Sequence, residues 1–104
     1  MAQFDVYLNP NPDTNDAIPY LLDVQADLLD MLTTRMVVPL VLAQAMGREA
    51  GQLNPKFKIK GSTVVMSTAE MAGIHMRALG DKVTSLKTKR DEIIAALDLL
   101  FTGI

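Results

Sequence analysis

Residues 56–66, KFKIKGSTVVM, carry the clearest strand signal in the chain. Phe57 and Ile59 alternate with lysines, which is the period-two pattern of a strand with one buried face. Gly61 then permits a tight turn into a second apolar run. This stretch predicts a β-hairpin, and it favours a fold built from short antiparallel strands.

Two alternating segments lie earlier in the chain. The first is QFDVYL, residues 3–8, which places Phe4, Val6 and Leu8 on one face and Gln3, Asp5 and Tyr7 on the other. The second is YLLDVQAD, residues 20–27, which alternates in the same way. The intervening NPNPDTND, residues 9–16, is rich in Asn, Pro and Asp, which favour turns. We expect two half-buried strands that pair with each other across an exposed loop.

The next segments are less regular. RMVVPLVL, residues 35–42, is β-branched and apolar, and because Pro39 cannot donate a hydrogen bond it indicates an edge strand or a bulge. Residues 42–53 predict a loop with at most a helical turn, since Gly47 and Gly51 interrupt the helix-forming residues. IHMRAL, residues 74–79, predicts one more short strand before Gly80 and Asp81.

From Lys87 onward the apolar period changes to that of a helix. The apolar positions are Ile93, Ile94, Leu97, Leu100 and Phe101. Thr88 and Asp91 have the spacing of a capping box. We therefore predict a single domain, residues 1–104, that is mainly β: a small barrel or strongly bent sheet with a C-terminal α-helix packed on it.

The composition and charge of the chain argue against several functional classes. The chain has 104 residues, of which 49% are hydrophobic and 5% aromatic, and this apolar surplus in a small domain favours an oligomer. Its net charge of −2 argues against independent nucleic-acid binding. The absence of cysteine, of a signal peptide and of a long apolar run predicts a soluble protein of the reducing cytoplasm, with no membrane association.

The sequence offers little material for catalysis. His75 is the only histidine, so triads and multi-histidine metal sites cannot form within one chain. Asp23, Asp27 and Asp30 could hold a divalent metal, but a solvated strand face is the better interpretation because no further ligand follows. No phosphate-binding glycine loop occurs. We expect neither a cofactor nor a metal, and no enzymatic activity.

Three other features have two interpretations each. The lysines at 56, 58 and 60 either contact phosphate or, as we prefer, protect a strand edge. The methionines either fill the core, as we prefer, or form an adaptable interface. The members of that set are Met36, Met46, Met66, Met71 and Met76. Finally, Leu28 and Leu29 are adjacent, so at least one of them is expected on the surface, as are residues 101–104 (FTGI). Exposed apolar residues favour a binding protein over an enzyme.

Four segments together resemble the CcdB family of toxins. They are QFDVY at the start, LDVQADLLD at 22–30, RMVVPL at 35–40 and the ending AALDLLFTGI. The resemblance implies an SH3-like barrel with a C-terminal helix, a two-fold homodimer and a non-catalytic toxin. Such a toxin binds the A subunit of DNA gyrase and traps the complex with cleaved DNA. A CcdA-type antitoxin neutralises it, and the two together repress their operon, with the antitoxin contacting the DNA.

The resemblance also implies site residues. The gyrase-binding set is Leu28, Leu29, Asp98, Phe101, Thr102, Gly103 and Ile104. The antitoxin-binding set is Leu28 and Leu29 with Asn9, Asn11 and Asp13 in the first loop. An alternative for Phe101 and Ile104 is that they only complete the core.

The chain departs from the family at two positions. Thr102 stands where the family's best-known ending has tryptophan, and loss of such an aromatic contact can cost about 1 to 3 kcal/mol of binding. His75 stands where the family often has proline.

A second functional hypothesis is a MazF-like ribonuclease toxin of the same fold, for which Arg35, His75 and Arg77 are the available residues.

Overall fold

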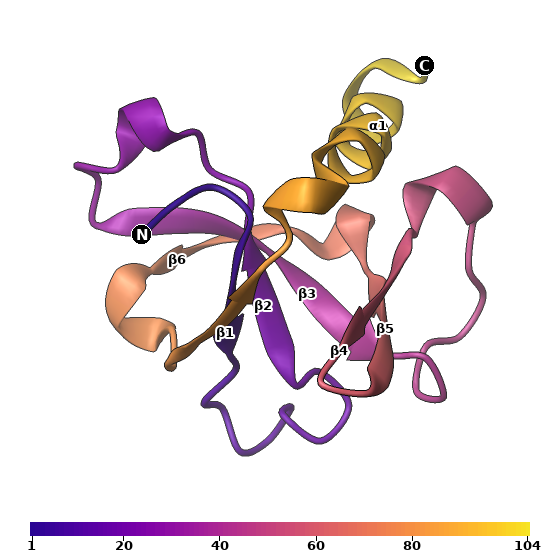
Figure 1. Cartoon of the computed structure of the whole chain (residues 1–104), viewed down its shortest axis with the longest axis horizontal. Coiled ribbons are helices and arrows are strands. Elements are labelled where there is room, and N and C mark those ends of the chain that lie inside the picture. Colours follow the sequence, from indigo (N-terminus) through magenta and orange to yellow (C-terminus); the bar gives the residue numbers. More distant parts are fainter.

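The computed structural model describes residues 1–104 and contains seven β-strands, five short 3-10 helices and one α-helix (Figure 1). The strands are β1 (Asp5–Leu8), β2 (Tyr20–Asp23), β3 (Thr34–Leu42), β4 (Lys56–Ile59), β5 (Ser62–Met66), β6 (Ala72–His75) and β7 (Lys82–Ser85). The 3-10 helices are η1 (Asp27–Leu29), η2 (Gly51–Leu53), η3 (Thr68–Glu70), η4 (Met76–Ala78) and η5 (Lys87–Lys89), and the α-helix is α1 (Arg90–Thr102).

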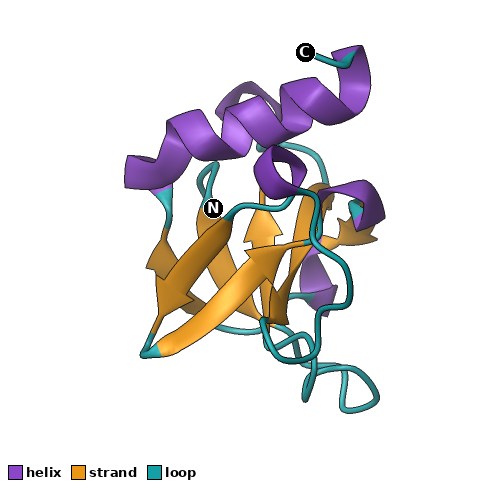
Figure 2. Ribbon diagram, turned by 90° about the vertical axis from the view of Figure 1, so that its right-hand side faces the viewer, coloured by secondary structure: helices purple, strands orange, loops and turns teal.

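All seven strands belong to one antiparallel sheet that curls into a half-barrel. The strand order is β4-β5-β3-β2-β1-β7, and β6 pairs with the other end of β3. The long strand β3 crosses the molecule, and α1 lies over one end of the curled sheet (Figures 1 and 2). The predicted fold, a mainly β SH3-like small barrel with a C-terminal helix, is confirmed.

The β4–β5 hairpin forms as predicted. The pairs run from Lys56 opposite Val65 to Ile59 opposite Ser62, which leaves a two-residue turn. Lys60 has φ 49° and Gly61 has φ 82°, and two positive φ angles fit the type I′ turn that matches strand twist. Phe57 and Ile59 are buried, whereas the three lysines are exposed. Because β4 is an edge strand, the lysine row agrees with edge protection.

Strand β1 pairs with β2 as expected, and Phe4 and Val6 are buried as predicted, but the opposite face is buried as well. Asp5 and Tyr7 are 4% and 6% exposed, and Leu8, which we had expected inside, is 42% exposed. The physical reason is that β1 lies between β2 and β7, and its polar side chains have partners inside the fold. Alternation alone does not reveal a strand whose polar face is also covered.

Pro39 does not mark an edge strand. β3 lies inside the sheet, where Pro39 is opposite Leu21 of β2. On its other side β3 pairs with β6 up to Val37 and with β5 from Leu40 onward. Pro39 accepts a hydrogen bond from the Ser67 N–H at 3.0 Å, so its missing donor faces the point where β3 changes partner. An irregularity is present, but it is a fork in the sheet.

The segment before the helix also differs from the prediction. β6 ends at His75, and Met76–Ala78 forms η4, so only residues 74 and 75 of the expected strand over residues 74–79 are in a strand. β7, Lys82–Ser85, was not predicted because KVTS is short and largely polar. It is a strand because β1 supplies a partner, with Asp5 opposite Ser85. Tertiary pairing here outweighs local preference.

The predicted helix forms, but the capping box does not. Thr88 belongs to η5, and the α-helix begins at Arg90 after Lys89, whose side chain makes no capping hydrogen bond. Ile93 and Ala96 are the buried residues of α1, and Ile94 and Leu97 are partly buried against the core. The core that they cover contains inward side chains of strands β1 to β5, among them Val6, Leu22, Val38, Leu40, Phe57, Val64 and Met66. The helix is thereby fixed on the barrel, and its C-terminal end projects.

Candidate functional site

The segment after β2 exposes a row of large apolar side chains. Leu28 is 86% exposed, Leu29 47%, Met31 79% and Leu32 44%. We call these four residues the Leu28–Leu32 ridge. The expectation that at least one leucine of the Leu28–Leu29 pair is exposed is confirmed, because both are. An isolated exposed leucine is ordinary, but four within five positions indicate an interaction surface.

Two methionines extend this apolar surface. Met36 of β3 and Met76 of η4 are each 39% exposed. The Met76 N–H donates to the Thr33 carbonyl at 2.8 Å, which places η4 beside the end of the ridge. The core interpretation holds for Met66, which is 0% exposed, but not for these two. Sequence reasoning also missed Met31 and Leu32; the signal was the apolar pair inside the otherwise polar stretch DMLTTR.

The second candidate surface is the end of α1. We call Asp98, Phe101, Thr102, Gly103 and Ile104 the helix tip. Phe101 is 69% exposed and Ile104 87%, so neither completes the core. The Thr102 hydroxyl donates to the Asp98 carbonyl at 2.7 Å, and the Gly103 N–H donates to the Leu99 carbonyl at 3.0 Å. Gly103 has φ 77°, which suits a glycine helix cap. Thr102 is thus the last helical residue, and Gly103 sets the direction of Ile104.

The predicted site residues fall into three separate places. β1 runs away from the N-terminus and β2 returns, so the loop over residues 9–16 lies at one end of the strand pair and η1 at the other (Figure 1). Four residues at about 3.4 Å each separate them by roughly 13 Å. No hydrogen bond or ion pair joins the ridge to the helix tip. Asn9, Asn11 and Asp13 are therefore not part of one compact patch with Leu28 and Leu29.

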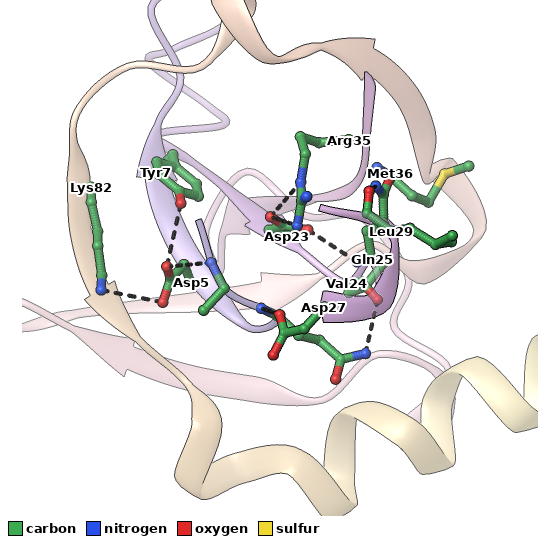
Figure 3. A network of polar contacts seen from close by, with 12 residues as sticks. Asp5, Tyr7, Asp23, Val24, Gln25, Asp27, Leu29, Arg35, Met36 and Lys82 are labelled. Carbon is green, nitrogen blue, oxygen red and sulfur yellow. Dashed lines mark hydrogen bonds and ion pairs between the residues drawn. The ribbon is translucent and has the colours of Figure 1, made fainter. Parts of the chain in front are cut away.

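A buried ion pair lies beneath the ridge. Nε of Arg35 donates to Oδ2 of Asp23 at 2.9 Å, and Nη2 lies 2.6 Å from the same oxygen (Figure 3). The two side chains are 1% and 0% exposed, and Nη1 has no hydrogen-bond partner. Burial raises the pKa of Asp23, whereas the Gln25 N–H and Arg35 act in the opposite direction. The interpretation of Asp23 as part of a solvated strand face is wrong.

Arg35 is consequently committed to Asp23 and is not accessible to a substrate. His75 and Arg77 are exposed on β6 and η4, where Nδ1 of His75 accepts a hydrogen bond from the Arg77 N–H at 3.1 Å. These three residues do not form a proton-transferring cluster. No three His, Asp or Glu side chains lie close enough to hold a metal ion, so Asp23, Asp27 and Asp30 do not converge.

A second polar cluster lies inside the sheet on β1. The Tyr7 hydroxyl donates to Oδ2 of Asp5 at 3.3 Å, and Nζ of Lys82 lies 3.3 Å from Oδ1 (Figure 3). Burial first, and then the negative charges of Asp5 and Asp23, raise the pKa of Tyr7 from 10.0 to about 12. This cluster explains why the polar face of β1 is buried.

The raised pKa of Tyr7 gives a measurable prediction. In a Tyr20→Phe variant Tyr7 is the only tyrosine, and its phenolate absorbance should appear with a pKa of about 12. Because the unfolded chain ionises near 10, the stability from neutral Tyr7 is present below pH 10 and is lost between pH 10 and 12. An ordinary titration near pH 10 in protein shown by circular dichroism to be folded would contradict the burial of Tyr7.

The family described as CcdB protein matches residues 3–103 of this chain. The chain belongs to the CcdB family. CcdB proteins are the toxins of toxin–antitoxin modules, and the chain is a toxin of that kind. No helix in the structure has the length and apolar character needed to span a bilayer.

Proposed function

We propose that this CcdB-family protein poisons DNA gyrase without catalysing a reaction itself. It binds the opened A subunit and traps the complex with cleaved DNA. The contacts come from the Leu28–Leu32 ridge and the helix tip. The observation that supports this most strongly is the exposure of Leu28, Phe101 and Ile104, at 86%, 69% and 87%. Leu28 lies within a hydrogen-bonded turn and Phe101 within the last turn of α1. Ordered apolar groups bind at a lower entropic cost than flexible ones.

The shape of the molecule supports binding over catalysis. Two hollows occur on the surface, one between η2 and α1 and one between the 9–16 loop and Gly80. Neither is lined by His75, Arg77, the ridge or the helix tip. With Arg35 buried, no observation favours the MazF-like ribonuclease hypothesis. Its remaining test is simple: RNA incubated with the purified protein should stay intact.

The same exposed surfaces suggest how a CcdA-type antitoxin neutralises the toxin in the cytoplasm. The ridge and the 9–16 loop lie at opposite ends of the β1–β2 pair, so a partner that contacts both must be extended. A disordered antitoxin tail that folds on binding meets that requirement. In this proposal toxin and antitoxin together repress their operon, and DNA is contacted by the antitoxin.

Leu28→Glu should weaken antitoxin binding at least tenfold, because it places a charge in the apolar contact. Leu28 is 86% exposed and lies in a turn without buried residues, so the fold should persist. Isothermal titration with the antitoxin gives the affinity. Lys58→Glu is the control, because it adds the same side chain on the distant edge strand β4. Unchanged affinity of Leu28→Glu would place the antitoxin elsewhere.

A homodimer is also part of the proposal. Ten large apolar side chains are exposed on one chain, including Leu28, Met31, Met36, Met76 and Ile104. Association of two copies is the common way to cover such a surplus. Sedimentation at micromolar concentration should give about twice the mass of the 11.4 kDa chain. A monomer under those conditions would contradict the two-fold arrangement.

The test of the proposed target is a DNA-cleavage assay with purified gyrase and supercoiled plasmid. A gyrase poison yields linear DNA after denaturation of the protein. A toxin that acts on RNA leaves the plasmid unchanged.

A further inference from the structure

Gln25 connects the ridge to the sheet by three hydrogen bonds. Its side-chain Nε2 donates to the Leu29 carbonyl at 2.9 Å, and its Oε1 accepts from the Met36 N–H at 3.0 Å. Its own N–H donates to Oδ1 of Asp23 at 3.0 Å. Figure 3 shows Gln25 between Asp23, Met36 and Leu29. One residue thus joins the strand, the buried ion pair and the end of η1, through its side chain and its backbone N–H.

The side-chain oxygen of Gln25 takes the place of a missing backbone acceptor at the end of the β2–β3 ladder. The last paired residues are Asp23 and Val37, and the Val24 N–H then donates to the Met36 carbonyl at 3.0 Å. The Met36 N–H would have no backbone partner from β2, because the chain turns away into η1. The amide oxygen of Gln25 supplies that acceptor, and its nitrogen holds the chain that has turned away.

Few other contacts hold η1 in place. None of its residues is buried, so packing contributes little to its position. On the opposite side, Oδ1 of Asp27 accepts a hydrogen bond from the Gln3 N–H at 2.7 Å, and Nε2 of Gln3 donates to the Val24 carbonyl at 3.2 Å. Gln25, through its side chain, and Gln3, mainly through its backbone N–H, therefore hold the segment that carries Leu28 and Leu29.

We infer that Gln25 is a positioning residue that holds the Leu28–Leu32 ridge in its binding conformation, and thereby sets the affinity for partners that dock on the ridge. This inference rests on the proposed function, in which gyrase and the antitoxin dock there. Gln25 itself is only partly exposed, and it acts through Leu28 and Leu29. Because the turn is already ordered before binding, the entropic cost of binding is lower.

The buried ion pair between Asp23 and Arg35 anchors Gln25. Asp23 uses Oδ2 for Arg35 and Oδ1 for the Gln25 N–H. The position of Gln25 is thus tied to a side chain that is 0% exposed. The exposed apolar ridge is in this way connected to the rigid interior through polar groups.

The test uses Gln25→Glu, which keeps an oxygen for the Met36 N–H but replaces the donor to the Leu29 carbonyl with a second acceptor. The control is Gln44→Glu, because Gln44 is exposed and its side chain makes no hydrogen bond to protein. A second variant, Gln25→Met, keeps the side-chain length, adds no charge and loses both side-chain bonds. Affinity for the gyrase A subunit and for the antitoxin is measured on full-length protein, with and without Leu28→Ala.

Hydrogen exchange gives a readout that does not depend on function. The N–H groups of Leu29, Asp30 and Leu32 bond to carbonyls inside the turn, so their exchange should accelerate in both Gln25 variants. Exchange in the β4–β5 hairpin should not change. Loss of one hydrogen bond corresponds to roughly a tenfold fall in affinity for each partner. Gln44→Glu should have no effect on either quantity.

The thermodynamic cycle distinguishes positioning from a general structural role. If Gln25 acts through the ridge, Gln25→Glu should lose its effect on affinity once Leu28→Ala has removed the contact. Equal effects in both backgrounds, or unchanged exchange at Leu29 to Leu32 in both Gln25 variants, would overturn the inference. Failure of the proposed function looks different, because Leu28→Ala alone would then leave affinity for both partners unchanged.

Discussion

Removal of Thr102, Gly103 and Ile104 is expected to abolish toxicity while leaving the protein folded. The deletion eliminates the Thr102 hydroxyl bond to Asp98 and the Gly103 N–H bond to Leu99, both at the exposed end of α1. Ile93 and Ala96, which attach the helix to the core, are untouched. The loss of stability should be about 1 kcal/mol or less, as is typical for an exposed helix end.

The measurements are growth arrest on induction, circular dichroism and antitoxin titration on the same proteins. A truncated chain that remains folded and still arrests growth would show that the helix tip is not the poisoning element. A truncated chain that unfolds would show that the tip contributes to the core.

Thr102→Trp is the matched gain-of-contact variant. It places an aromatic side chain at an exposed position and should strengthen the proposed gyrase poisoning.

Arg35→Met should destabilise the protein by about 3 to 5 kcal/mol, which is a large part of the stability of a small domain. The substitution keeps apolar volume but leaves the Asp23 carboxylate 0% exposed and without its cation. The double variant Asp23→Leu/Arg35→Met removes both charges and should recover most of the loss. Urea unfolding at one fixed protein concentration gives the three free energies.

The double-mutant cycle of Asp23 and Arg35 gives the interaction energy between the two side chains. A strong departure from additivity is expected because the two groups share one oxygen contact, at 2.6 and 2.9 Å, and no water-exposed surface. Additive losses would mean that Asp23 and Arg35 act independently, which the buried geometry contradicts. The double variant should also loosen the turn at Gln25, since Oδ1 of Asp23 accepts its N–H.

The elements predicted correctly from the sequence are those in which the apolar side chains face the core and the polar side chains face solvent. Phe57 and Ile59 face the core and their lysine neighbours face solvent, so alternation revealed β4. Ile93, with a helical period around it, revealed α1. The elements predicted wrongly depend on partners distant in the chain. β7 forms because β1 lies beside it, and Pro39 is accommodated because β3 changes partner there.

The candidate site was only partly predictable for a related reason. The exposure of at least one leucine of the Leu28–Leu29 pair follows from their adjacency, since both cannot face the core from one short turn. The role of Gln25 could not be predicted, because it depends on where the Met36 N–H and the Leu29 carbonyl lie in space. Asp23 has the sequence pattern of a surface carboxylate, because its cationic partner, Arg35, lies twelve residues later in the chain.

The most direct test of the account is gyrase-mediated cleavage of supercoiled plasmid in the presence of the purified protein. Linear DNA should accumulate with the unaltered protein, fall at least tenfold with Leu28→Glu, and be absent with the chain that lacks residues 102–104. Antitoxin added in excess should suppress cleavage by the unaltered protein. Plasmid that remains supercoiled with the folded, unaltered protein would contradict gyrase as the target.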